Sequence, residues 1–248
     1  MARRPKNCLV VHAHPDPNSF SAALRDRAVA ALAATGATVQ LIDLYRPRYQ
    51  PMLTAREHRD YFSIASDHPD PTTAEHIAAI TAADTLVFIY PTWWSGLPAI
   101  MKGWLDRTLL PDVAFTLTPS GDPGGDDQTT APASNGEDDK HGEAGEDDKH
   151  GEAGEDDKHG KAGEWPTGVV APALTNITRI VGITTYGSGR AEVLLLGDAG
   201  RRTITRTVRL VCARRCRTTW LGMHRLDTAT DEERARFLDR VETKLGGL

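Results

Sequence analysis

The chain has 248 residues, of which 40% are hydrophobic, and a formal net charge of −5 at pH 7. This length suits one large domain or two small ones, and no apolar run approaches the roughly 20 residues of a membrane-spanning helix. The negative charge is concentrated in one repetitive segment, so the remainder is near neutral and lacks the basic footprint of a nucleic-acid-binding protein. We therefore expect a globular protein with no nucleic-acid partner and no membrane insertion.

The N-terminus is basic, but only a short apolar stretch follows it before His12 and His14, which is a poor match to a signal peptide. Three cysteines are too few for a disulfide framework, and these features together predict a cytoplasmic protein. Cys212 and Cys216 are four residues apart, a spacing that allows them to share a helix face. We interpret them as buried thiols and expect no metal site, because no second pair of ligands lies nearby.

Apolar strand-like runs alternate with helix-like segments along the chain. In chain order, strands are predicted over residues 8–11, 38–44, 85–90, 179–184 and 218–223, and helices over residues 21–34, 72–83, 98–110, 201–214 and 231–245. This alternation is typical of an α/β protein with a parallel, doubly wound sheet. Such sheets bind ligands beyond the carboxyl ends of their strands, so functional residues should follow the first, third and fourth strands.

A segment between the third and fourth strands differs from the rest in composition. Residues 136–162 contain three tandem nine-residue units of the form Gly-Glu-Asp-Asp-Lys-His-Gly-Glu-Ala, the last with Lys161 in place of Glu. Such units cannot bury enough apolar surface to offset the entropy of ordering them, so residues 119–164 are predicted to be a disordered insert within a single domain of residues 1–248. An alternative is that the recurring His141, His150 and His159 bind a metal weakly beside the carboxylates.

Small and polar residues follow each of the three relevant strands. After the first strand, Asn18, Ser19 and Ser21 precede or begin a helix whose free N–H groups suit a phosphate, although Ser19 is an equally good helix cap. His14 in the same loop either donates to a phosphate or stabilises the turn. After the third strand, two adjacent tryptophans offer flat apolar walls for a planar heterocycle, or they only cover the end of the sheet. After the fourth strand, residues 184–189 combine hydroxyl groups with glycines. Neither a Gly-x-Gly-x-x-Gly nor a Walker sequence is present.

Three motifs resemble those of the flavodoxin-like NAD(P)H:quinone oxidoreductases, the family of DT-diaphorase and its bacterial relatives. They are Ala-His-Pro-x-x-x-Ser-Phe from residue 13, Pro-x-x-Trp-x-Gly-x-Pro-Ala-x-x-Lys-Gly-Trp-x-Asp-Arg from residue 91, and Thr-Thr-x-Gly from residue 184. The second motif is the most specific, and the resemblance covers nearly the whole chain outside the insert. It implies a five-stranded sheet of order 2-1-3-4-5 and a homodimer with the active site at the interface.

The resemblance implies that the first loop binds a flavin phosphate, the second holds the isoalloxazine ring, and the third lies along its pyrimidine side. FAD is favoured, with FMN as the alternative, and NAD(P)H is the implied hydride donor in a ping-pong reaction with a quinone or similar acceptor. With the residues singled out from spacing, the predicted cofactor-binding set is His14, Asn18, Ser19, Phe20, Ser21, Pro91, Thr92, Trp93, Trp94, Ser95, Gly96, Thr184, Thr185, Tyr186 and Gly187.

One departure from the family pattern concerns catalysis. The best-studied members place a Tyr and a His after the third motif, where an ungapped match puts Glu192 and Asp198 in this chain. Tyr186 is the predicted catalytic substitute. The change leaves two alternatives open: a specialised flavin-dependent reductase acting on a biosynthetic intermediate, and a non-catalytic flavin-binding electron carrier or regulatory subunit.

Overall fold

The computed structural model describes residues 5–63, 68, 70–118 and 169–248. Residues up to 118 and from 170 onward form one compact unit. The predicted disordered insert at 119–164, with its three histidines, lies outside the described residues.

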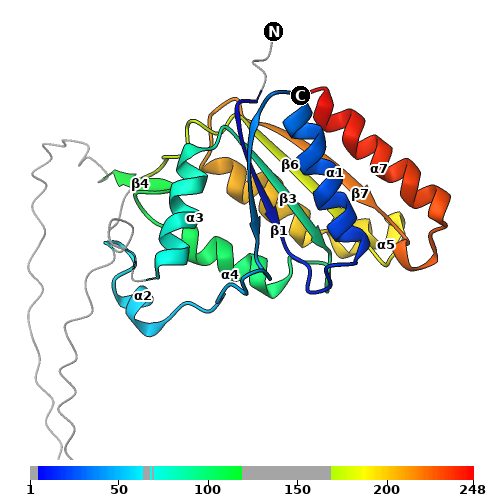
Figure 1. Ribbon diagram of the computed structural model, residues 1–248. Helices are drawn as coiled ribbons and strands as arrows, with labels where there is room; N and C mark the ends of the chain where they lie inside the picture. Colours follow the sequence, from blue (N-terminus) through cyan, green and yellow to red (C-terminus); the bar gives the residue numbers. More distant parts are fainter. Residues whose placement is uncertain (1–4, 64–67, 69, 119–168) are drawn as a thin grey trace, which may run out of the picture. The chain divides into compact units, whose positions relative to one another are not determined.

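The main sheet has five parallel strands in the order β2-β1-β3-β6-β7, which confirms the predicted flavodoxin-like architecture (Figure 1). The central strand β3 and its neighbours β1 and β6 are largely apolar, and β3 and β6 are buried along their whole length, as expected when helices cover both faces. Its strands are β1 (Asn7–His12), β2 (Thr38–Asp43), β3 (Thr85–Pro91), β6 (Arg179–Thr185) and β7 (Arg217–Met223).

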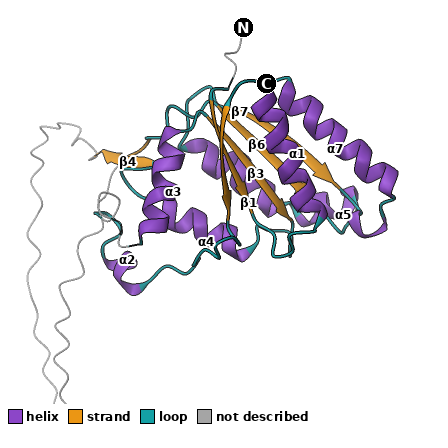
Figure 2. Cartoon of the chain, in the orientation of Figure 1, coloured by secondary structure: helices purple, strands orange, loops and turns teal. Residues whose placement is uncertain are grey.

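Helices cover both faces of this sheet (Figure 2). On one face, α1 (Phe20–Ala34) and α7 (Asp231–Gly246) pack side by side, with Leu24 and Val241 buried in one apolar core. On the other face, α3 (Pro71–Ala82) and α4 (Ala99–Thr108) contribute to a second core, in which Trp104 of α4 is fully buried. The helix–sheet–helix layering therefore follows from the apolar faces that the sequence pattern predicts.

The elements that the sequence pattern missed are short. They are the helices α2 (Ala55–Arg59), α5 (Arg190–Leu196) and η3 (Leu226–Thr228), and the strands β4 (Phe115–Thr118) and β5 (Val169–Pro172) of a separate two-stranded sheet. These helices have at most seven residues and these strands have four, so the hydrophobic period of each is too short to recognise in the sequence.

The helix predicted over 201–214 is wrong at both ends. It begins at Ala199, where Asp198 caps α6 (Ala199–Arg202), and continues as a π-helical segment, η2 (Thr203–Val208). It ends before Cys212, because the carbonyl of Val211 accepts the backbone N–H of Leu174 at 3.0 Å, a tertiary pairing that replaces further helical bonds. Cys212 and Cys216 therefore do not share a helix face, although both are buried as predicted.

Candidate functional site

The order of the strands defines where a ligand site would lie. β1 pairs with β2 on one side and with β3 on the other, so the direction of winding reverses between β1 and β3. Loops at the carboxyl ends of the strands diverge at such a switch point and leave a crevice for a ligand. The loops after His12, Pro91 and Thr185 all open at this edge, as the sequence predicts.

Strand β1 ends with a fully buried histidine, directly before the first loop. His12 Nδ1 lies 3.3 Å from Asp43 Oδ2, and His12 Nε2 lies 3.3 Å from the hydroxyl of Ser21. Burial lowers the pKa of His12 to about 4, and this effect outweighs the attraction of Asp43, so the ring is neutral at pH 7. Burial alone would raise the pKa of Asp43, but the backbone N–H of Tyr45 and the guanidinium of Arg46 hold it below its usual range.

The predicted phosphate-binding residues of this loop occupy different environments. Ser19 is the N-cap of α1, and its hydroxyl accepts the N–H of Ala22 at 3.2 Å, so its capping role is observed. Ser21 is buried and its side chain points to His12, which leaves only its backbone N–H for a ligand. Phe20 packs against Phe237 of α7, with ring centroids 6.4 Å apart. Asn18 is exposed.

His14 links the first loop to the second. Its ring centroid lies 6.3 Å from that of Trp93, and its Nδ1 accepts the backbone N–H of Asp16 at 3.1 Å. In the tautomer that accepts this bond, Nε2 carries the proton and can donate to an anion. The predicted phosphate donor and the predicted ring wall are thus neighbours in space.

The loop after β3 is a tight turn that projects an indole into solvent. Trp93 and Gly96 pair with each other, and Trp94 and Ser95 between them have φ angles of 48° and 57°. Left-handed backbone costs a non-glycine residue roughly 1–2 kcal/mol, and such outliers gather at functional sites. Trp93 is 42% exposed and Trp94 is fully exposed. Gly96 has room for a Cβ and an ordinary φ, so the turn itself does not require glycine there.

The loop after β6 is fastened to the tryptophan turn. The backbone N–H of Thr92 donates to the carbonyl of Thr185 at 2.8 Å, and the hydroxyls of Thr92 and Thr184 lie 2.9 Å apart. Pro91, Thr184 and Thr185 are buried, so they position the two loops rather than line an open surface. Gly187 is exposed, and a Cβ there would lie 2.8 Å from the Asp227 carboxylate. The structure therefore brings the second and third predicted loops into one unit.

Tyr186, the predicted catalytic residue, lies at the centre of a polar and aromatic cluster. Its hydroxyl donates to Asp198 at 2.8 Å and accepts the indole N–H of Trp220 at 3.1 Å, and its ring stacks on His224 with centroids 4.5 Å apart. Burial, followed by the adjacent Asp198 carboxylate, raises the pKa of Tyr186, so the phenol stays protonated. Glu192, by contrast, caps α5 through the N–H of Gly189 and lies outside this cluster.

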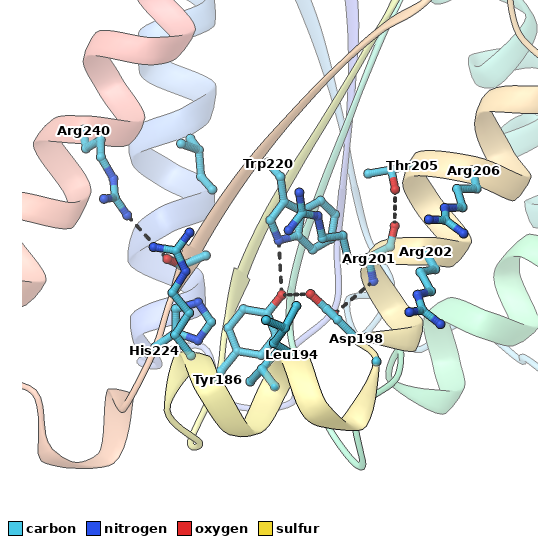
Figure 3. Close-up of a pocket in the computed structure, with 15 residues that line it drawn as sticks. Tyr186, Leu194, Asp198, Arg201, Arg202, Thr205, Arg206, Trp220, His224 and Arg240 are labelled. Carbon is cyan, nitrogen blue, oxygen red and sulfur yellow. Dashed lines mark hydrogen bonds between the residues drawn. The ribbon is translucent and has the colours of Figure 1, made fainter.

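Next to this cluster is a cavity of about 750 Å³ (Figure 3). Sequence reasoning missed it, because its lining residues come from α5, α6, η2, β7 and α7, and no single stretch shows the convergence. Arginines dominate its charged groups, and apolar walls are provided by Val193, Leu194 and Trp220. The arginines that line it are Arg190, Arg201, Arg202, Arg206 and Arg240.

Two further observations concern only the described part of the chain. No group of three or more His, Cys, Asp or Glu side chains there could hold a metal ion. No helix in this part is both long enough and apolar enough to cross a membrane.

Comparison with known proteins gives one family match and several relatives of similar sequence. The family described by its flavodoxin-like fold matches residues 6–142. Ribosyldihydronicotinamide dehydrogenase [quinone] from Pongo abelii is 33% identical in an alignment 131 residues long, which covers 45% of this chain and 54% of the relative. NAD(P)H dehydrogenase [quinone] 1 from Rattus norvegicus is 29% identical in an alignment 133 residues long, which covers 48% of this chain and 48% of the relative. The chain thus spans about half the length of the relatives it matches.

A solved structure agrees in fold. The NAD(P)H:quinone oxidoreductase from Methanothermobacter marburgensis superimposes with a TM-score of 0.63 at 19% identity, covering 99% of this chain and 96% of that one. The fold is that of a doubly wound α/β protein, and the loops after β1, β3 and β6 lie at the carboxyl ends of its strands. The chain belongs to the family of proteins with the flavodoxin-like fold.

Proposed function

We propose that this protein is a flavin-dependent NAD(P)H oxidoreductase that reduces a quinone or a similar acceptor. The observation that carries the proposal is the tryptophan turn at the end of β3, which lies at the switch point between the β1 loop and the β6 loop. The names of the relatives, which are quinone dehydrogenases, support the same reaction class.

The residues of the three loops fit a flavin. Trp93 and Trp94 supply flat apolar surface, and His14 lies beside them with a ring nitrogen free to donate to a phosphate. No described residue accepts the backbone N–H groups of Ser95 or Gly187, so both are available to a polar ring edge. An uncommitted N–H also begins α1 at Phe20, where the helix dipole favours an anion.

A bound flavin would supply hydride transfer, through its N5 atom, between NAD(P)H and the acceptor of a ping-pong reaction. The chain's own task is to orient the two stacked partners and to stabilise negative charge at the ring. Gly187 is an exposed residue whose N–H can donate to that charge, and Thr92 and Thr184 hold this loop against the tryptophan turn. The fully exposed Trp94 provides the wall against which a planar molecule can stack.

The proposal also includes the identity of the flavin, which is either FAD or FMN. The Ser-Phe sequence at Ser19 and Phe20 favours FAD by its resemblance to the quinone reductases, whereas a structural neighbour from Bacillus anthracis is named as an FMN-dependent NADH-azoreductase. Phe20 is turned toward Phe237 and α7, so it supports the start of α1 rather than facing the crevice. We retain FAD as the first expectation, and mass spectrometry of the released cofactor decides between them.

A homodimer with the active site at its interface is also part of this proposal. Leu194, Leu195 and Leu196 of α5 are 80%, 87% and 63% exposed, and Trp94 is fully exposed. Contiguous exposed apolar side chains of this kind are typical of an interaction surface. A single species of twice the chain mass in analytical ultracentrifugation is expected, and a monomer at micromolar concentration would contradict it.

Steady-state kinetics tests the proposed activity. The flavin-loaded full chain should oxidise NADH or NADPH with a soluble quinone as acceptor, and initial rates at several quinone concentrations should give the parallel double-reciprocal lines of a ping-pong reaction. A protein that binds flavin but shows no turnover with a panel of quinones would instead be an electron carrier or a regulatory subunit.

A further inference from the structure

The five arginines that line the cavity beside Tyr186 come from elements far apart in the sequence. Figure 3 shows Arg201, Arg202 and Arg206 on the α6–η2 helix, and Arg240 of α7 on the other side of Trp220. Arg190 of α5 completes the set. All five are exposed residues, so solvent screens their mutual repulsion. Their positive charges nevertheless converge on one hollow, which favours an anionic ligand.

The charges of these arginines are not neutralised by neighbouring carboxylates. Within the described part of the chain, none of the five forms a salt bridge with Asp or Glu within 4.0 Å. Asp198 is the single carboxylate in the lining, and it caps α6 and accepts the hydroxyl of Tyr186. Arg240 donates to the backbone carbonyl of Gly222 at 3.4 Å and lies over the Phe237 ring. The cavity therefore has a net positive lining whose guanidinium groups are not paired with carboxylates.

The cavity also has surface suited to a flat ring and a direct connection to the flavin loop. Leu194 and Trp220 line it, and Arg201 lies over the Trp220 indole at 5.9 Å from the ring centroid. His224 lines it too, and its buried Nδ1 has no hydrogen-bond partner among the described residues. Tyr186, which directly precedes the exposed Gly187, forms part of the wall. A volume of about 750 Å³ lies within the range of small-molecule sites.

We infer that this cavity binds the phosphorylated adenosine end of NADPH, and that its arginines give the protein a preference for NADPH over NADH. The inference rests on the proposed function, because the nicotinamide of the same molecule must reach the flavin at the Tyr186–Gly187 loop. Arginine forms bidentate, charge-assisted bonds with phosphate, and an arginine beside the adenosine ribose is a common means of accepting a 2′-phosphate. NADPH differs from NADH only by this 2′-phosphate.

A binding experiment tests the site without requiring turnover. Isothermal titration calorimetry of the flavin-loaded full chain should show that adenosine 2′,5′-bisphosphate binds about tenfold or more tightly than adenosine 5′-monophosphate, as expected for added charge-assisted hydrogen bonds. The Arg202→Gln, Arg206→Gln double variant should lose most of that difference. Arg215→Gln is the matched control, because Arg215 is an exposed arginine in the turn before β7 and outside the cavity.

Other results would overturn the inference. Equal affinity for the two nucleotides, or a preference that survives the double variant, would show that the arginines do not recognise the 2′-phosphate. Displacement of the bisphosphate by inorganic phosphate at equal concentration would reveal a simple anion site instead. An altered sedimentation profile of the double variant without a change in nucleotide binding would assign the arginines to contacts between copies of the chain.

Kinetics separates failure of this inference from failure of the proposed function. The ratio of kcat/KM for NADPH to that for NADH should exceed ten in the unaltered protein and move toward one in the double variant. Active protein with a ratio near one would overturn the inference and leave the reductase intact. Binding of the bisphosphate that depends on Arg202 and Arg206, in a protein without NAD(P)H oxidation, would support the site and contradict the proposed activity.

Discussion

Among single residues, His12 has the clearest consequence for stability. Its ring is fully buried, and burial lowers its pKa from 6.5 to about 4. Between these values the unfolded chain binds a proton that the folded chain does not, so stability falls as pH drops through this window. We expect His12 to account for a loss of about 2 kcal/mol between pH 7 and pH 5. Urea denaturation at both pH values measures the loss, and a His12→Gln variant should show a smaller one; equal losses would contradict the assignment.

Tyr186 is the residue whose predicted catalytic role is most open to a direct test. Its proton is directed to Asp198 and its ring stacks on His224, so Tyr186→Phe removes the hydroxyl while the ring can stay in place. We expect kcat to fall about tenfold or more, as for loss of a positioned proton donor, with flavin content unchanged. Tyr90→Phe is the matched control, because the buried Tyr90 hydroxyl has no hydrogen-bond partner among the described residues. Full activity of Tyr186→Phe would exclude a catalytic role.

At the scale of elements, Arg107 of α4 anchors the segment between β2 and α3. Its Nε donates to Glu57 of α2 at 2.8 Å, its Nη2 lies 3.0 Å from Asp70, and both Arg107 and Glu57 are buried. The last residue of the long motif after β3 thus has a structural role. Arg107→Met should lower the free energy of unfolding by about 3–5 kcal/mol, because it leaves a buried carboxylate unpaired.

An exposed ion pair on the same helix provides the comparison. Lys102 and Asp106 form an i,i+4 pair in which both side chains are about half exposed. Lys102→Met should cost less than about 1 kcal/mol, the usual range for a surface pair. Chemical denaturation of both variants measures the contrast, and similar losses would show that the Arg107 cluster is not a tertiary anchor.

The elements also show what the sequence could and could not predict. All five strands of the main sheet were predictable, because each is an apolar run bounded by turn residues, as at Thr85–Pro91. The end of the helix before Cys212 was not predictable, because it depends on the pairing of Cys212 with Leu174, which is distant in the sequence. The tryptophan turn was found from its motif, whereas its left-handed Trp94 and Ser95 were not, since neither residue type favours that backbone.

At the scale of the whole molecule, the sequence predicted the loops of the candidate site but not the cavity beside them. Loops that directly follow strands share one edge of a parallel sheet, so His14, Trp93 and Tyr186 could be grouped in advance. The cavity could not, because its arginines lie on helices whose orientation depends on packing. Arg201, Arg202 and Arg206 stand in a stretch rich in arginine, where sequence alone does not show which side chains face Trp220.

The repetitive insert allows a test of domain organisation. Its sequence predicts a tether that contributes no apolar core, and the closure entropy of a loop changes slowly with its length. Replacing residues 119–164 by a short Gly-Ser linker should leave the thermal unfolding midpoint, flavin content and kcat within error of the full chain. Loss of activity with folding retained would assign a functional role to the repeat, and loss of folding would contradict the single-domain prediction.

The central claim is that the loops after β1, β3 and β6 hold a flavin, and cofactor content tests it most directly. The full chain, purified or incubated with FAD and FMN and then desalted, should show flavin absorbance near one equivalent per chain, and native mass spectrometry should identify the molecule. Trp94→Ala should weaken its binding, because it removes the exposed indole of the turn. A colourless protein that takes up neither flavin would contradict the account.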